Sequence, residues 1–123
     1  TCALLWYTLD DEKLSDKAKL ACEQIPKAGG SVSAISIWEI GLKIKNGKLD
    51  INTNIEDFVY RLRKMGSIEI IPVDETIWIK NLTLDWSHRD PADRTIVATA
   101  ILKNLPIITS DKIISSFYDN VIW

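Results

Sequence analysis

The chain has 123 residues, 46% of them hydrophobic, with a formal charge of −2 and a pI near 5.3. These values suit one domain, taken here as residues 1–123, and argue against disorder or a protein that coats nucleic acid by positive charge. No apolar run approaches the roughly 20 residues that cross a bilayer, and no signal peptide is visible. We therefore expect no contact with membranes. Cys2 and Cys22 lack metal-binding spacing; one disulfide between them is conceivable, but we expect a reduced, cytoplasmic protein.

Taken in chain order, apolar periodicity and capping residues predict two helices followed by alternating strands and helices. The predicted elements are helices over 1–9, 16–25, 36–46, 55–65, 75–84, 91–103 and 112–118, and strands over 31–35, 67–73, 105–109 and 121–123. Strands separated by helical segments indicate parallel pairing with helices on both faces. The expected fold class is therefore α/β, a three-layer α/β/α sandwich around a central, mainly parallel sheet.

The start of the predicted helix over 91–103 carries two carboxylates with different explanations. Asp90 precedes Pro91, which is favoured at the first helical position, so Asp90 reads as an N-cap. Asp93 instead lies within the apolar stripe that continues through Ile96 and Val97. A carboxylate that faces the core is costly without a partner. Complementing the helix dipole is enough to explain Asp90, whereas the direction of Asp93 favours a function.

Two further acids follow predicted strands. Glu39 lies in the first helical turn after one strand, and Asp111 directly follows another. Since the carboxyl ends of parallel strands share one edge of a sheet, where ligands bind, we expect these acids to meet Asp90 and Asp93 there. A capping box formed by Ser36 and Glu39 would explain the glutamate equally well without a function.

Four converging carboxylates repel one another unless a cation lies between them. Oxygen ligands without histidine or cysteine suit Mg²⁺ or Mn²⁺. The lone histidine, His88, is not needed as a ligand and is expected to be a loop residue. A divalent ion held by carboxylates, with no phosphate-binding glycine loop nearby, suggests hydrolysis of phosphodiester bonds.

At these residues the chain resembles the PIN-domain ribonucleases, and within them the VapC-type toxins of toxin–antitoxin pairs. The resemblance covers essentially all 123 residues and is carried by TCALLW, SAISIWEIGLKIKNGKL, HRDPADRTIVATA and IITSD. It implies an α/β/α fold, an acidic Mg²⁺ or Mn²⁺ site and RNA cleavage, with tRNA or another structured RNA as substrate. It also implies an antitoxin protein as partner and a homodimer.

By motif match, the resemblance makes Glu39, Asp93 and Asp111 catalytic metal ligands, with Asp90 as a less direct one. The supporting residues that it implies are Thr1, Arg94, which would orient an acid or a phosphate, and Thr109 and Ser110, which would position a ligand or water. The resemblance also places a first strand, ending in one more acid, directly before Thr1. We therefore expect that the sequence is clipped at its start and lacks this strand and ligand.

Two other functions stay open. A catalytically impaired PIN-fold module would keep only its protein-binding surface, and saturable Mn²⁺ binding that protects against unfolding would distinguish the enzyme from it. A receiver-type phosphoryl acceptor would need an acidic cluster after the first strand. Asp10 and Asp11 follow a helix instead, which argues against this third function.

Overall fold

The computed structural model describes residues 1–123 as an α/β fold whose strands all pair in parallel. The helices are α1 (Cys2–Leu9), α2 (Asp16–Glu23), α3 (Ile25–Ala28), α4 (Ala34–Lys45), α5 (Ile55–Lys64), α6 (Glu75–Thr83), α7 (Pro91–Lys103) and α8 (Lys112–Ser115). The strands are β1 (Gly30–Ser33), β2 (Ile68–Ile71), β3 (Ile107–Ile108) and β4 (Val121–Ile122). No helix has both the length and the apolar character needed to span a membrane.

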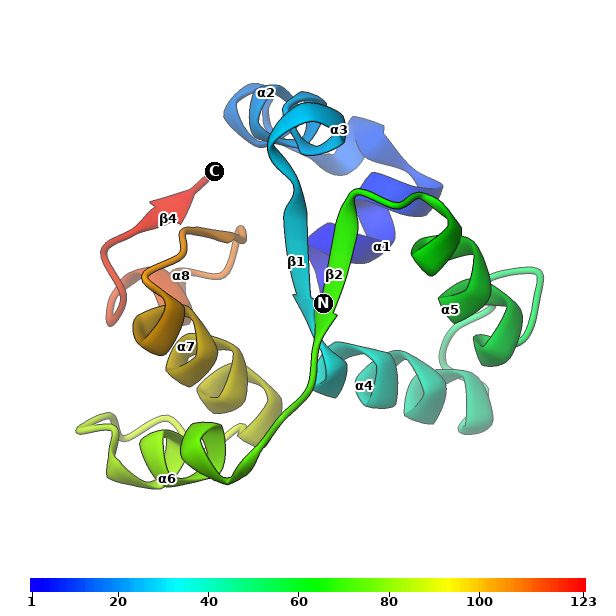
Figure 1. Ribbon diagram of the computed structural model, residues 1–123. Coiled ribbons are helices and arrows are strands. Elements are labelled where there is room, and N and C mark those ends of the chain that lie inside the picture. The colour runs from blue at the N-terminus through cyan, green and yellow to red at the C-terminus, as the bar shows by residue number, and fades with distance from the viewer.

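The strands form two separate parallel pairs instead of the single central sheet expected from the sequence. β1 pairs with β2, from Gly30 opposite Ile68 to Ser33 opposite Ile71, and β3 pairs with β4 over two residues. Figure 1 shows α1, α4 and α5 on one side of the β1–β2 pair and α6, α7 and α8 on the other. The parallel α/β architecture is thus confirmed, whereas its sheet is divided.

An apolar cavity of about 750 Å³ lies where the two strand pairs face each other. Its lining includes Val32 of β1, Ile107 and Ile108 of β3, and Thr1. The inner edges of β1 and β3 do not pair with each other, so the cavity is flanked by strand edges. The expected strand ahead of Thr1 stays a prediction.

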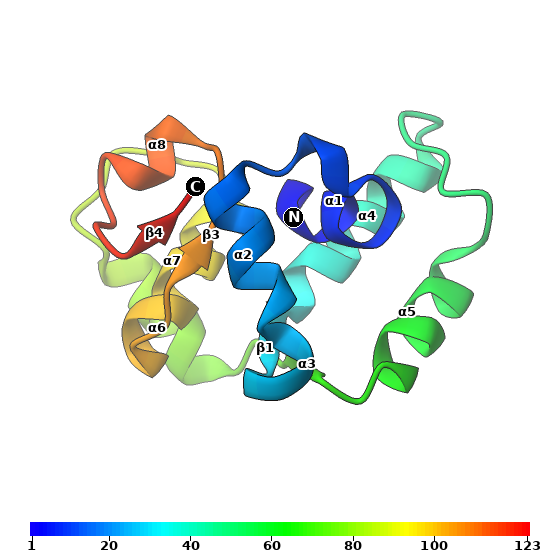
Figure 2. The same ribbon diagram turned by 90° about the horizontal axis from the view of Figure 1, so that it is seen from above.

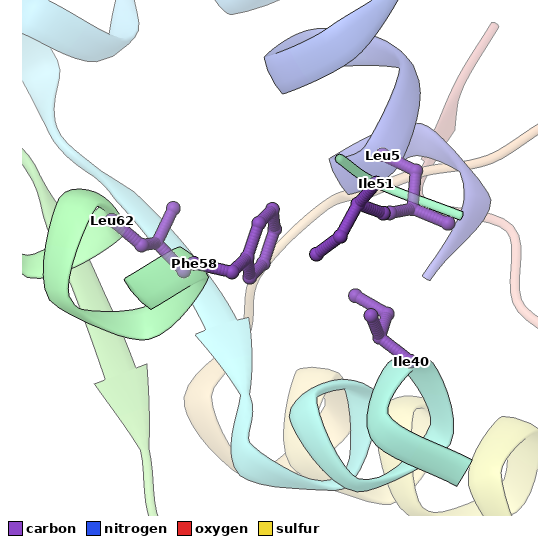
Figure 3. Close-up of a cluster of buried hydrophobic side chains, with 5 residues drawn as sticks. All are labelled: Leu5, Ile40, Ile51, Phe58 and Leu62. Atoms are coloured by element: carbon purple, nitrogen blue, oxygen red, sulfur yellow. The ribbon is translucent and has the colours of Figure 1, made fainter. Parts of the chain in front are cut away.

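The largest buried cluster lies between α1, α4 and α5. It contains Leu5, Ile40, Ile51, Phe58 and Leu62, and Figure 3 shows these side chains directed toward one another from their separate segments. Fully burying an aliphatic or phenyl side chain contributes about 1.5–3 kcal/mol. This cluster fixes α4, and with it Glu39, against the N-terminal helix.

A second cluster joins α7 to β3 and α8. It contains Val97, Ala100, Ile107 and Ile114, and α6 packs along α7 on the other side. Seen from above, β3 lies beside α7 and leads toward α8 (Figure 2). The element that carries Asp93 and the segment that carries Asp111 are therefore held together by one buried core.

Helix α4 begins at Ala34, two residues earlier than the sequence predicted. The Ser33 hydroxyl accepts a hydrogen bond from the Ile35 N–H at 3.2 Å, so Ser33 is the N-cap and β1 ends there. Ser36 lies inside the helix and is 3% exposed. The capping-box explanation for Glu39 is therefore wrong, because it required Ser36 as the N-cap and the N-cap is Ser33.

Candidate acidic site

Asp90 is the N-cap of α7, as the sequence predicted. Its Oδ1 accepts a hydrogen bond from the Asp93 N–H at 2.9 Å, and Pro91 occupies the first helical turn. The side chain is exposed. Since its cap bond and its position at the positive end of the helix dipole already account for it, Asp90 needs no further role to explain its identity.

Asp93 lies one turn into the same helix, with its side chain 24% exposed. Its Oδ2 is 2.8 Å from Nε2 of His88. Burial raises the pKa of the Asp93 carboxyl above its ordinary value, the charges of Asp90 and Asp111 raise it further, and the His88 hydrogen bond lowers it. Asp111 comes from a different segment of the chain, so two acids distant in sequence act on each other here.

Glu39 projects from the first half of α4 toward Thr1. The Thr1 hydroxyl contacts both the Glu39 carboxylate, as a hydrogen-bond donor, and the Ser36 hydroxyl, at 3.0 Å. Thr1 thus lies against an acid of α4, and α4 packs in turn against α7, the helix that carries Asp93.

Asp111 follows β3 and caps α8. Its Oδ1 accepts a hydrogen bond from the Ile113 N–H at 2.8 Å. The Asp111 N–H in turn donates to the Thr109 hydroxyl at 3.1 Å, whereas Ser110 is exposed. Thr109 therefore supports the backbone that carries Asp111, and the expected role of Thr109 and Ser110 in positioning a ligand or water stays a prediction.

Arg94 has a different task from the one that the sequence suggested. Its Nη1 donates to the carbonyl oxygens of Trp86 and His88 at 2.6 and 3.0 Å. Its Nη2 donates to those of Asn81 and Leu84 at 2.6 and 3.2 Å. The guanidinium thus binds backbone carbonyls of the segment before α7, and neither an acid nor a phosphate is needed to satisfy it.

His88 is the residue of this site that sequence reasoning missed. It lies in a loop, as expected, but its ring contacts Asp93, and Trp86 packs against it with ring centroids 4.9 Å apart. Trp86 also stacks on Phe117, with centroids 4.6 Å apart. No periodic pattern relates a loop histidine to an aspartate five residues later, so the sequence contained no spacing signal for this contact.

The carboxylates surround one region without forming a coordination shell. No three acidic, histidine or cysteine side chains lie close enough together to hold one ion. Each acid instead has a separate hydrogen-bond partner: Thr1 for Glu39, His88 for Asp93 and the Ile113 N–H for Asp111. The expected close cluster is therefore absent from this arrangement.

The donor chemistry still fits a hard divalent cation. In each of Glu39, Asp93 and Asp111, one carboxylate oxygen accepts the bond described above and the other accepts none from the protein. Carboxylate oxygens are the ligands that Mg²⁺ and Mn²⁺ prefer. The assignment of these three acids as metal ligands stays a prediction.

The fold and these acids define an α/β domain with an acidic face beside parallel strands. A comparison with protein families matches residues 1–120 to the family described as the PIN domain, and the chain belongs to that family. PIN domains are generally nucleases, which supports a nuclease function for this chain. Neither the curated proteins nor the solved structures include a match to it.

Proposed function

We propose that this chain is a divalent-metal-dependent endoribonuclease, the VapC-type toxin of a toxin–antitoxin pair, which hydrolyses structured RNA such as tRNA. The observation that carries this proposal is the environment of Asp93. Its carboxylate is mostly buried at the start of α7 and is affected by the charges of Asp90 and Asp111. A perturbed acid among other acids is typical of a functional site, and membership of the PIN family supplies the class of reaction.

In this proposal Glu39, Asp93 and Asp111 would hold Mg²⁺ or Mn²⁺. The ion would supply a Lewis acid that activates water and offsets charge on the phosphate. The other residues place the acids. Asp90 fixes the first turn of α7 through its cap bond, and Thr109 fixes the backbone of Asp111.

The test is cleavage of a tRNA pool, with Mn²⁺ affinity measured separately by calorimetry. Glu39→Gln, Asp93→Asn and Asp111→Asn should each reduce cleavage by about 10²–10³-fold, the range typical for losing one electrostatic contact to a transition state. They should also weaken Mn²⁺ binding. Asp119→Asn is the matched control, because Asp119 is an exposed aspartate whose side chain makes no hydrogen bond or ion pair. An Asp93→Asn protein that cleaves at the wild-type rate would refute the site assignment.

A protein-binding module without catalysis is the second candidate. The favouring observations are the lack of a three-ligand cluster and the exposed apolar side chains on α4 and α6. Trp38 is 58% exposed, Leu82 79% and Ile79 61%. As a toxin, the protein should form a homodimer in light scattering at micromolar concentration and should bind an antitoxin protein. A monomer that binds no Mn²⁺ and cuts no RNA would favour the binding module.

A further inference from the structure

The segment between α6 and α7, residues 84–89, is a loop with little support from its own backbone. No backbone-to-backbone hydrogen bond involves residues 85–89. Nevertheless the loop places His88 within 2.8 Å of Asp93. Something other than secondary structure must therefore define the position of the imidazole.

Two side chains supply that support. Arg94 donates to the carbonyl oxygens of Leu84, Trp86 and His88 and so holds the loop at both ends. A guanidinium presents several donors in a rigid plane, which suits it to bind a set of carbonyls at once. Trp86 is fixed in turn by its stacking on Phe117, which lies just beyond α8.

The loop supports the ring of His88 as well as its backbone. Trp86 packs against the imidazole at a tilt of 44°, while the His88 carbonyl is held by Arg94. When Asp93 is ionised its carboxylate can only accept hydrogen bonds, and Nε2 of His88 is then the donor to Oδ2 of Asp93. A hydrogen bond to a charged acceptor is shorter and stronger than a neutral one.

We propose that His88 is a positioning residue for Asp93: it holds Oδ2 and thereby directs Oδ1 toward the acidic site. The inference rests on the proposed role of Asp93 in that site. His88 is the only group of the protein that donates to the Asp93 carboxylate, so no other contact selects between the two oxygens. Residues that hydrogen-bond to metal ligands typically affect metal affinity or activity by about 10–100-fold.

The competing explanation is that the pair only stabilises the fold by joining the loop to α7. The two explanations differ in what a mutation changes. A structural contact would alter the melting temperature and leave the kcat of the folded fraction unchanged. A positioning contact would lower kcat and Mn²⁺ affinity, with KM for RNA and the folded fraction nearly unchanged.

The experiment compares His88→Ala and His88→Gln with Ser87→Ala in the full chain. The glutamine Nε2 can donate from nearly the same place as the imidazole Nε2, and Ser87 is an exposed neighbour that makes no hydrogen bond. His88→Ala should lower kcat and Mn²⁺ affinity about 10–100-fold. His88→Gln should recover most of that loss, and Ser87→Ala should match the wild type. The positioning role is overturned if His88→Gln is no better than His88→Ala, or if His88→Ala matches Ser87→Ala.

A readout that does not need catalysis separates this inference from the proposed function. Nitrogen-15 NMR of the metal-free wild type should show His88 protonated at Nε2. A neutral imidazole protonated only at Nδ1 would refute the donation to Asp93. Wild-type protein that binds Mn²⁺ but cuts no RNA would refute the proposed nuclease. In that event the NMR spectrum and the Mn²⁺ affinities of the His88 variants still decide the positioning role.

Discussion

Replacing Arg94 by alanine should destabilise the protein substantially, because this side chain attaches residues 84–89 to α7. Its two shortest bonds are the 2.6 Å contacts to the carbonyls of Trp86 and Asn81. Hydrogen bonds that involve a charged group contribute about 1.5–3 kcal/mol each. Arg94 is only half-buried, so water can replace its longer bonds. Taking the low end of that range for the two short ones gives a loss of roughly 3 kcal/mol.

Thermal unfolding followed by circular dichroism measures this loss. For a domain of this size, 1 kcal/mol corresponds to about 4 °C, so Arg94→Ala should lower the Tm by about 12 °C. Arg89→Ala is the matched control, since Arg89 is an exposed arginine of the same loop with no hydrogen bond or ion pair. It should change the Tm by no more than about 2 °C, as expected for a surface substitution.

Arg94→Lys distinguishes support of the loop from a role as a positive charge. Lysine keeps the charge but has one nitrogen, which cannot reach the four carbonyls that two guanidinium nitrogens bind. We therefore expect Arg94→Lys to lose most of the stability that Arg94→Ala loses. Full recovery in Arg94→Lys would refute this reasoning and return Arg94 to the charge-based role that the sequence suggested. The reasoning would also be refuted if Arg94→Ala had the same melting temperature as Arg89→Ala.

Two other predictions concern the metal-free protein. Burial raises the pKa of Asp93, so the folded state holds its proton more tightly than the unfolded chain does. The free energy of unfolding should therefore fall as the pH rises from the ordinary pKa of an aspartate through the raised pKa of Asp93. In urea unfolding, Asp93→Asn should lack this pH dependence and should be as stable as the wild type at pH 7, or slightly more stable. A decrease of roughly 0.3–1 kcal/mol in its free energy of unfolding would instead indicate that Asp93 stabilises the helix dipole. Extending Thr1 by an apolar, strand-forming segment should fill the cavity between β1 and β3 and raise the Tm, whereas a Gly/Ser extension of equal length should not.

The parts of the fold that were predicted correctly depend on interactions between residues close in sequence. Asp90 and Pro91 define the start of α7 within a single turn, and Asn104 ends it in the left-handed conformation, with φ of 53°. The start of α4 was wrong because Ser33 and Ser36 are both good caps in the sequence. Only the end of β1, fixed by pairing with β2, selects Ser33.

The positions of Arg94 and His88 could not be predicted for a different reason. Their contacts depend on the course of a loop that has neither apolar periodicity nor backbone hydrogen bonds. In the sequence, Arg94 is one more charged residue in the first turns of a helix, and such residues usually point to solvent. In the structure its guanidinium points back toward Asn81, in the last turn of α6, and Leu84, the first residue of the loop.

A helix start and a strand end determine where Asp93 and Asp111 lie in the fold, so these two positions could be predicted, whereas the hydrogen-bond partners of the acids could not. Glu39, Asp93 and Asp111 each have one oxygen held by a donor from the protein and one oxygen without such a donor. A cation that bound the three free oxygens would therefore not have to displace Thr1, His88 or the cap bond of α8. The three side chains would have to move closer together, because they do not lie near enough to hold one ion in this arrangement. A positive charge among them would offset the burial and the acidic neighbours that raise the pKa of Asp93.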